Sequence, residues 1–117
     1  ILPYHQIVDG DYYVDDGNSR YYNQLANTKQ VQKDWNSAED LMAQAPQYNY
    51  GLVLDYNPEC TPGKGSAIFL HCPKSWNNTG TSGCISIPEE DMKQVVCQVD
   101  TGTKIVVVQD ESDLANY

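Results

Sequence analysis

Two residues near the middle of the chain carry side chains that could perform covalent chemistry. His71 ends an apolar, strand-like run, and Cys84 follows it after a polar loop rich in Gly, Asn, Ser and Thr. A histidine that takes the proton of a cysteine produces a thiolate nucleophile, which is the minimum equipment for acyl transfer. Gly83 comes directly before the cysteine, and a residue without Cβ lets the backbone bend sharply and lets a substrate approach it. These residue types in this order predict a Cys–His acyl-transfer site, whose backbone N–H groups could bind an oxyanion.

The same residues also allow a purely structural interpretation. Most cysteines are packing residues or half-cystines, and a histidine at the end of an apolar strand is often a hydrogen-bonded core residue. If Cys84 is a nucleophile, at most one disulfide can form within the chain, and the sequence does not choose its pair among Cys60, Cys72 and Cys97. If all four cysteines are bridged, the chain is instead a catalytically silent, disulfide-stapled extracellular binding module. The number of free thiols distinguishes the two hypotheses.

The composition indicates one acidic globular domain. The 117 residues are enough for one ordinary hydrophobic core. A net charge of −9 argues against nucleic acid as a partner, because phosphate binding requires clustered Lys and Arg side chains. No apolar run is long enough to span a membrane. The cysteines form no C-x-x-C pair and have poor spacing for a zinc site, so we expect neither a metal nor another cofactor.

The pattern of apolar residues predicts a mainly β chain with one or two short helices. Residues 65–71 are apolar at neighbouring positions and are predicted to form a central strand, buried on both faces. Pro88 is predicted to begin a helix because proline suits the first turn, and the acidic residues 89–91 favour the same turn through the helix dipole. The other predicted elements are strands at 7–8, 12–14, 48–57 and 104–108, a short helix after Asn36 or Ser37, and a solvated tail over 109–117.

Two motifs in the chain resemble a known family. Residues 63–71 (Gly-Lys-Gly-Ser-Ala-Ile-Phe-Leu-His), followed by Thr-Ser-Gly-Cys at 81–84, are similar to the L,D-transpeptidase (YkuD-like) catalytic domain. The similarity is greatest to the bacterial subgroup with a Gly-Ser-Ala-Ile-Phe-His segment before a Thr-x-Gly-Cys nucleophile turn. The resemblance covers nearly the whole chain, because it extends upstream through residues 11–16, 18–23, 38–39 and 50–57.

The resemblance implies a compact β-rich domain, a β-sandwich or mixed sheet, that crosslinks the bacterial cell wall from an extracellular, wall-associated location. Such enzymes attack the carbonyl between the third residue of a peptidoglycan stem tetrapeptide and its terminal D-Ala. They release D-Ala, hold the rest as a thioester on Cys, and pass it to an amine on a neighbouring stem. Water as the acceptor would make the chain an L,D-carboxypeptidase instead. Peptidoglycan stem peptides are thus the implied partners, and carbapenem β-lactams are the implied inhibitors.

The resemblance also implies a role for each residue of the two motifs. Cys84 matches the nucleophile, and His71 matches the upstream His, which takes the thiol proton and later serves the acceptor amine. A backbone carbonyl in the turn at 81–83 could orient the imidazole, and N–H groups there could bind the oxyanion. The implied catalytic residues are therefore Cys84, His71, Gly83 and Ser82, and the implied substrate-binding residues are Thr81, Ser86 and Phe69.

Three features depart from the family pattern. Ser82 occupies a position where many members have His, and Ser86 one where many have Arg, although the subgroup named above also lacks both. The family's upstream Thr-Pro-x-Gly segment is absent, and the chain begins with Ile1 rather than Met. We therefore expect residues 1–117 to be a single catalytic domain that lacks its N-terminal strands. An open sheet edge, or another polypeptide, is expected beside the strand at 65–71.

Overall fold

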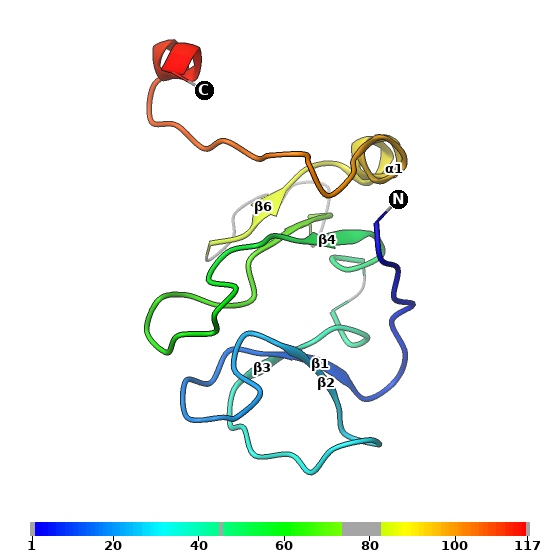
Figure 1. Cartoon of the computed structure of the whole chain (residues 1–117). Coiled ribbons are helices and arrows are strands. Elements are labelled where there is room, and N and C mark those ends of the chain that lie inside the picture. Colours follow the sequence, from blue (N-terminus) through cyan, green and yellow to red (C-terminus); the bar gives the residue numbers. More distant parts are fainter. Residues whose placement is uncertain (1, 45, 74–82, 117) are drawn as a thin grey trace.

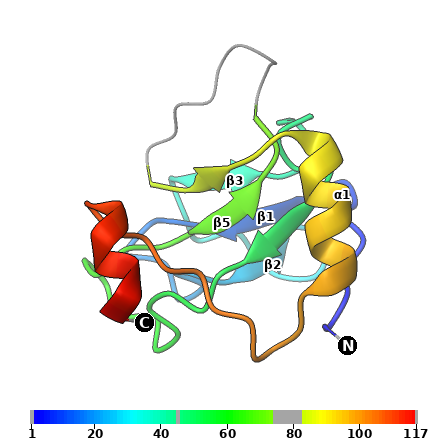
Figure 2. The same ribbon diagram turned by 90° about the horizontal axis from the view of Figure 1, so that it is seen from above.

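A computed structural model describes residues 2–44, 46–73 and 83–116 of the chain. Within these residues the fold is mainly β, with six short strands in two three-stranded sheets, one α-helix and one 3₁₀-helix. Figure 1 shows the two sheets in separate layers, with α1 (Glu89–Gln98) on the side of the second sheet that faces away from the first. In Figure 2 the 3₁₀-helix η1 (Glu111–Asn116) lies on the opposite side of the molecule from α1. This architecture confirms the expected mainly β fold with short helices.

The first sheet is antiparallel and has the strand order β2-β1-β3. Its central strand β1 (Asp11–Val14) pairs with β2 (Leu25–Asn27) on one side and with β3 (Ala38–Asp40) on the other. Trp35 is buried against this sheet and packs with Val14. The other residues packed around Trp35 are Tyr12, Tyr21, Ala26, Val31 and Ala38.

The second sheet has the strand order β4-β5-β6 and places its most buried strand in the centre. β5 (Phe69–His71) runs antiparallel to β4 (Gly51–Val53) and parallel to β6 (Ile85–Ser86). All three residues of β5 are buried, which confirms the prediction that the apolar run before the histidine is a central strand. The strand begins later than predicted, because Ala67 has a left-handed backbone conformation with a φ of 53°.

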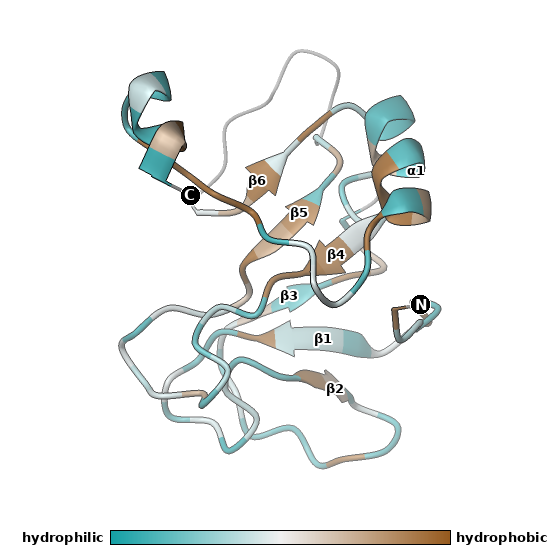
Figure 3. Cartoon of the chain, turned by 45° about the horizontal axis from the view of Figure 1, so that its top comes forward, coloured by the Kyte–Doolittle hydropathy of each residue, from teal (hydrophilic) through white to brown (hydrophobic). Residues whose placement is uncertain are grey.

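Helix α1 covers the outer face of the second sheet, beside its apolar strands (Figure 3). It begins directly after Pro88, as predicted, and its first turn is acidic, which complements the positive end of the helix dipole. Met92 is fully buried and packs against Leu70. Leu70 therefore points to the helix. Because side chains alternate along a strand, Phe69 and His71 point to the opposite face, toward the first sheet.

β5 has a strand on each side, so the open edge that we expected beside residues 65–71 is not found there. β4 and β6 flank it and themselves form the two edges of the second sheet. β5 is therefore paired on both sides by strands of the same chain. No helix in the described ranges is long and apolar enough to cross a membrane.

Two predictions for the first sheet were wrong. The short helix expected after Ser37 is strand β3, because residues 38–40 pair with β1 and this pairing outweighs the weak helix-capping signal. Residues 7–8 are not a strand. The Val8 carbonyl instead accepts the Asp11 N–H at 3.1 Å across the turn that leads into β1.

The strand predicted at 48–57 is much shorter in the structure. Only β4, within this range, pairs with β5. Before β4, the Asn49 N–H donates to the Pro46 carbonyl at 3.0 Å and closes a turn. The alternating apolar pattern thus extends beyond the residues that find a strand partner.

Residues 104–108 do not form the predicted closing strand. This segment leads from α1 to η1 (Figure 2), and Val107 within it is 78% exposed. Within the described part of the chain no strand pairs with this run, so its β-branched side chains have no sheet to pack on. The residues that follow are exposed, as predicted for a solvated tail, but they form η1.

Asp11 fastens the residues before β1 to the first sheet. It is 2% exposed and accepts hydrogen bonds from His5 Nε2 at 2.7 Å, Val8 N–H at 2.9 Å and Asn27 Nδ2 at 2.9 Å. Burial by itself raises the pKa of Asp11, but the bonds from these three residues together outweigh burial and hold the pKa below its ordinary value. The folded chain therefore favours the ionised carboxylate.

We expect Asp11→Asn to lower the free energy of unfolding at neutral pH by about 1–3 kcal/mol, the cost of leaving buried donors without their acceptor. The pKa of Asp11 is depressed in the folded state, so its contribution is present above the unfolded pKa of about 3.9 and is lost as the pH falls through the folded pKa. The difference between wild type and variant should therefore shrink in acid. Urea unfolding at neutral and acidic pH measures this difference in the free energy of unfolding, and Asp55→Asn, at an exposed position, is the control. Equal losses in both variants would contradict a special role for Asp11.

Candidate active site

β5 and β6 bring His71 and Cys84 to the same face of the second sheet. The strands are parallel, with Leu70 opposite Ile85, and both of these side chains pack toward α1. Cys84 lies one residue before Ile85, so it faces the other way and packs with Phe69. His71, two residues after Phe69, shares that face. His71 therefore lies on β5 and Cys84 lies directly before β6, and both face the first sheet.

The Cys84 thiol is held by backbone groups at the start of β5. Its S–H donates to the Ala67 carbonyl at 3.1 Å, and the Phe69 N–H donates to the sulfur at 3.3 Å. The side chain is half-buried among apolar residues. The sulfur thus has an acceptor for its proton and a donor for its lone pair on the same segment.

The environment of Cys84 favours the protonated thiol. Burial raises the pKa of Cys84, the Phe69 N–H partly offsets this rise, and the negative charge of Glu39 raises the pKa further. The net pKa lies above the ordinary value, so the resting thiol is protonated at neutral pH. A base must therefore take this proton before the sulfur can act as a nucleophile.

The His71 ring is 2% exposed and is fixed on several sides. Nδ1 lies 2.6 Å from the Cys72 carbonyl, and Nε2 lies 3.3 Å from the side-chain nitrogen of Gln47. The Tyr48 ring packs edge-on against the imidazole, with ring centroids 5.3 Å apart. A carbonyl can only accept, so Nδ1 carries the hydrogen and Nε2 is the basic atom of the neutral ring. The Gln47 amide then donates to Nε2.

Sequence reasoning missed both groups that orient the imidazole. We expected the orienting carbonyl in the turn at 81–83, but the carbonyl bonded to Nδ1 belongs to Cys72, directly after His71. Gln47 is buried, and its backbone carbonyl also accepts the Cys72 N–H at 3.0 Å. No local sequence pattern marks Gln47 for this role, because the role arises only when the turn before β4 lies beside β5.

The predicted substrate-binding residues occupy different environments. The Phe69 ring is 3% exposed and packs edge-on against two tyrosine rings, at 4.8 and 5.3 Å between centroids. Its link to the site is its backbone N–H, which bonds the Cys84 sulfur. Ser86 lies in β6 opposite His71 and is half-buried. Ser86 is therefore a neighbour of His71, whereas Phe69 supports Cys84 from the core.

Only part of the predicted nucleophile turn can be placed. Thr81 and Ser82 lie outside the described residues. Gly83 is exposed, and a Cβ at this position would lie 3.5 Å from Ile68 Cδ1, an ordinary contact. Packing therefore does not by itself require glycine here. What the glycine provides is exposed backbone next to Cys84.

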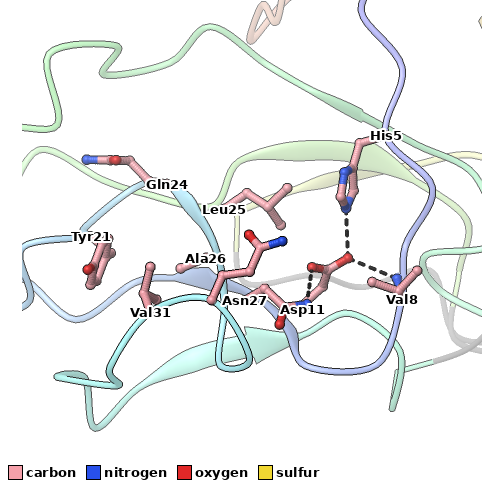
Figure 4. A pocket seen from close by; sticks show the side chains of 10 residues that line it. His5, Val8, Asp11, Tyr21, Gln24, Leu25, Ala26, Asn27 and Val31 are labelled. Atoms are coloured by element: carbon pink, nitrogen blue, oxygen red, sulfur yellow. Dashed lines mark hydrogen bonds and ion pairs between the residues drawn. The ribbon is translucent and has the colours of Figure 1, made fainter.

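A separate cavity of about 390 Å³ lies on the first sheet (Figure 4). The ion pair between His5 and Asp11 lies on its wall, together with Tyr21 and three amide side chains. None of the predicted site residues lines this cavity. It is distinct from the face that carries His71 and Cys84.

The described side chains form neither a metal site nor a disulfide. Within the described ranges, no three His, Cys, Asp or Glu side chains are grouped so that they could hold a metal ion. All four cysteines lie within the described residues, and none of them forms a disulfide. The disulfide-stapled binding module requires these cysteines to be bridged, so the structure gives that alternative no support.

The sequence model of the L,D-transpeptidase catalytic domain (YkuD) matches residues 3–107, which is most of the chain. The chain belongs to this L,D-transpeptidase family. The matched range contains both His71 and Cys84, and the family consists of acyltransferases that act on peptidoglycan peptides. No curated protein and no solved structure matches the chain. Family membership confirms the resemblance on which the residue roles were predicted.

Removal of the Glu39 charge should make the thiol of this L,D-transpeptidase domain easier to ionise. That carboxylate raises the pKa of Cys84, so Glu39→Gln should move the midpoint of Cys84 alkylation by iodoacetamide to lower pH. Alkylation at neutral pH should then be faster. Peptide mass spectrometry across a pH series follows the rate at Cys84. Glu59→Gln, at an exposed position, is the matched control, and an unchanged midpoint in Glu39→Gln would contradict the charge effect.

Proposed function

We propose that the chain is an L,D-transpeptidase that acts on peptidoglycan stem peptides through a thioester on Cys84. The proposal depends on the position of His71 on β5 and of Cys84 directly before β6, on one face of the sheet, in a chain of this family. The fixed tautomer of the imidazole supports it, because Nε2 is left as the base. The reaction takes place at the bacterial cell wall, where stem peptides are present.

In the first half-reaction, Nε2 of His71 takes the thiol proton of Cys84. The thiol must first leave the Ala67 carbonyl, and Nε2 must exchange its bond with Gln47 for one with the sulfur. The sulfur then bonds to the carbonyl carbon between the third stem residue and D-Ala, and N–H groups around Gly83 bind the resulting oxyanion. The C–N bond breaks, the D-Ala amine leaves with the proton from His71, and a thioester remains.

In the second half-reaction, an amine of a neighbouring stem attacks the thioester. His71 takes a proton from this amine, the bond between carbon and sulfur breaks, and Cys84 recovers the proton as it returns to the thiol. With water in place of the amine the same steps produce a carboxypeptidase. The two activities share the first half-reaction and differ in the acceptor alone.

The residues around His71 and Cys84 have assigned roles in the two half-reactions. His71 becomes an imidazolium in both half-reactions, and its Nδ1–H bond to the Cys72 carbonyl strengthens when the ring is charged. We assign substrate contacts to Ser86, beside the base, and to Thr81 and Ser82, before the nucleophile. Phe69 contributes its backbone N–H to the sulfur.

The wild-type chain should release D-Ala from a stem tetrapeptide and should form a covalent adduct with a carbapenem. Both reactions require the Cys84 thiolate, so Cys84→Ala should abolish D-Ala release and the mass increase. Cys97→Ala, at an exposed position on α1, should retain both. Chromatography of the peptides and intact-protein mass spectrometry measure the two results.

The peptide products distinguish a transpeptidase from a carboxypeptidase. D-Ala with a crosslinked dimer identifies a transpeptidase, and D-Ala with a free tripeptide identifies the carboxypeptidase. Absence of D-Ala release from the wild type would contradict the proposed function. An adduct that persists in Cys84→Ala would place the nucleophile at another residue.

His71→Ala should slow acylation about 10²–10⁴-fold, as expected for loss of a positioned proton transfer, which corresponds to about 3–5 kcal/mol in the barrier. His71 is buried beside Tyr48, so the melting temperature is measured in parallel. His71→Gln retains a hydrogen-bonding side chain and should be equally slow with a smaller loss of stability. Unchanged acylation per folded molecule in His71→Gln would show that His71 is a core residue and not a base.

A further inference from the structure

Ala67 has a backbone conformation that residues with a Cβ rarely adopt. Its φ is 53°, in the left-handed region, and the residue is buried beside Phe69. The angle φ measures rotation about the N–Cα bond and so turns the rest of the residue relative to its N–H. A positive φ therefore points the Ala67 carbonyl in a different direction from the one it would have in an extended strand. The carbonyl lies 3.1 Å from the Cys84 sulfur and accepts its proton.

The side chain that binds Ala67 comes from the first sheet's layer. Asn23 follows β1, and its Oδ1 accepts the Ala67 N–H at 3.0 Å. Its Nδ2 donates to the carbonyls of Tyr56 at 3.1 Å and Asn57 at 2.7 Å. Asn23 is 8% exposed, and its amide thus has a partner for the oxygen and for each hydrogen.

Asn23 is itself anchored to β1. Its N–H donates to the Val14 carbonyl at 2.7 Å, and its φ is 58°, a value that asparagine tolerates better than most residues. A continuous set of hydrogen bonds therefore runs from the end of β1, through Asn23 and Ala67, to Cys84.

We propose that Asn23 is a positioning residue for the nucleophile: by binding the Ala67 N–H, it keeps the Ala67 carbonyl on the Cys84 thiol and holds the sulfur in one place. This inference rests on the proposed role of Cys84. A carbonyl that accepts an S–H bond favours the thiol over the thiolate. Loss of Asn23 should therefore make Cys84 ionise at lower pH, while the sulfur is no longer held in a single starting position for acylation.

A neighbouring asparagine provides a matched control. Asn57 also has a positive φ, of 52°, and its Nδ2 donates to the carbonyls of Thr61 and Gly65 in the same loop. Its side chain does not bond Ala67. Substitution of Asn57 should therefore loosen the loop without releasing the Ala67 carbonyl from the thiol.

The test compares Asn23→Gly with Asn57→Gly, because glycine accepts a positive φ at either position and only the side-chain bonds are lost. In Asn23→Gly, the midpoint of Cys84 alkylation by iodoacetamide should fall by about half a pH unit, or about threefold in thiolate at neutral pH. Acylation by a carbapenem should slow in the same variant. In Asn57→Gly the melting temperature should fall and the midpoint should not move.

The comparison of these two variants tests the hydrogen-bond route from Asn23 through Ala67 to Cys84. Two results would overturn the proposal: an unchanged midpoint in Asn23→Gly, or equal shifts in Asn23→Gly and Asn57→Gly.

The variant Asn23→Asp and the activity of the wild type provide two further checks on the role of Asn23. If Asn23→Gly does not fold, Asn23→Asp retains Oδ1 as the acceptor for Ala67, so its midpoint should equal or exceed that of the wild type. A lower midpoint in Asn23→Asp would overturn the proposal. A wild type that releases no D-Ala, with the alkylation midpoints shifted as expected, would remove the transpeptidase role and leave the positioning role of Asn23 in place.

Discussion

β5 is buried on both faces, and this burial fixes the register of the second sheet. Leu70 faces α1 and Phe69 faces the first sheet, so a shift of one residue would exchange the two sets of side chains. The parallel register with β6 then places Cys84 beside Phe69, on the same face as His71. His71 and Cys84 thus reach the same face of the sheet because of a packing requirement that involves neither of their reactive atoms.

Polar groups buried by this packing need hydrogen-bond partners, and in this chain the partners also orient the site. The Cys72 carbonyl and the Gln47 amide bond the two ring nitrogens of His71, and Asn23 bonds the backbone before β5. Removal of one partner leaves a buried donor or acceptor unpaired, which costs more free energy than the net contribution of the bond. The stability of the fold and the orientation of His71 therefore depend on the same few amides and carbonyls.

Elements with strong local signals are the ones that the sequence predicts correctly. The apolar run before His71 became the central strand, and the acidic turn after Pro88 became the start of α1. Residues 38–40 carry a helix-capping signal but form β3, because their pairing with β1 is decided by tertiary structure. The run at 104–108 has high β propensity, yet it stays exposed for lack of a strand partner among the described residues. For the same reason the motifs predict His71 as the base and Cys84 as the nucleophile, whereas the contact of Gln47 with His71 is visible only in the folded chain.

The chain has four cysteine thiols, and we claim that the acyl group is carried by Cys84 alone. Acid-quenched peptide mapping of the chain during turnover of a stem tetrapeptide distinguishes Cys84 from the other three cysteines. We predict a thioester of the stem without its terminal D-Ala on Cys84 and on no other cysteine. An acyl group on Cys60, Cys72 or Cys97, or release of D-Ala without any thioester, would contradict the claim.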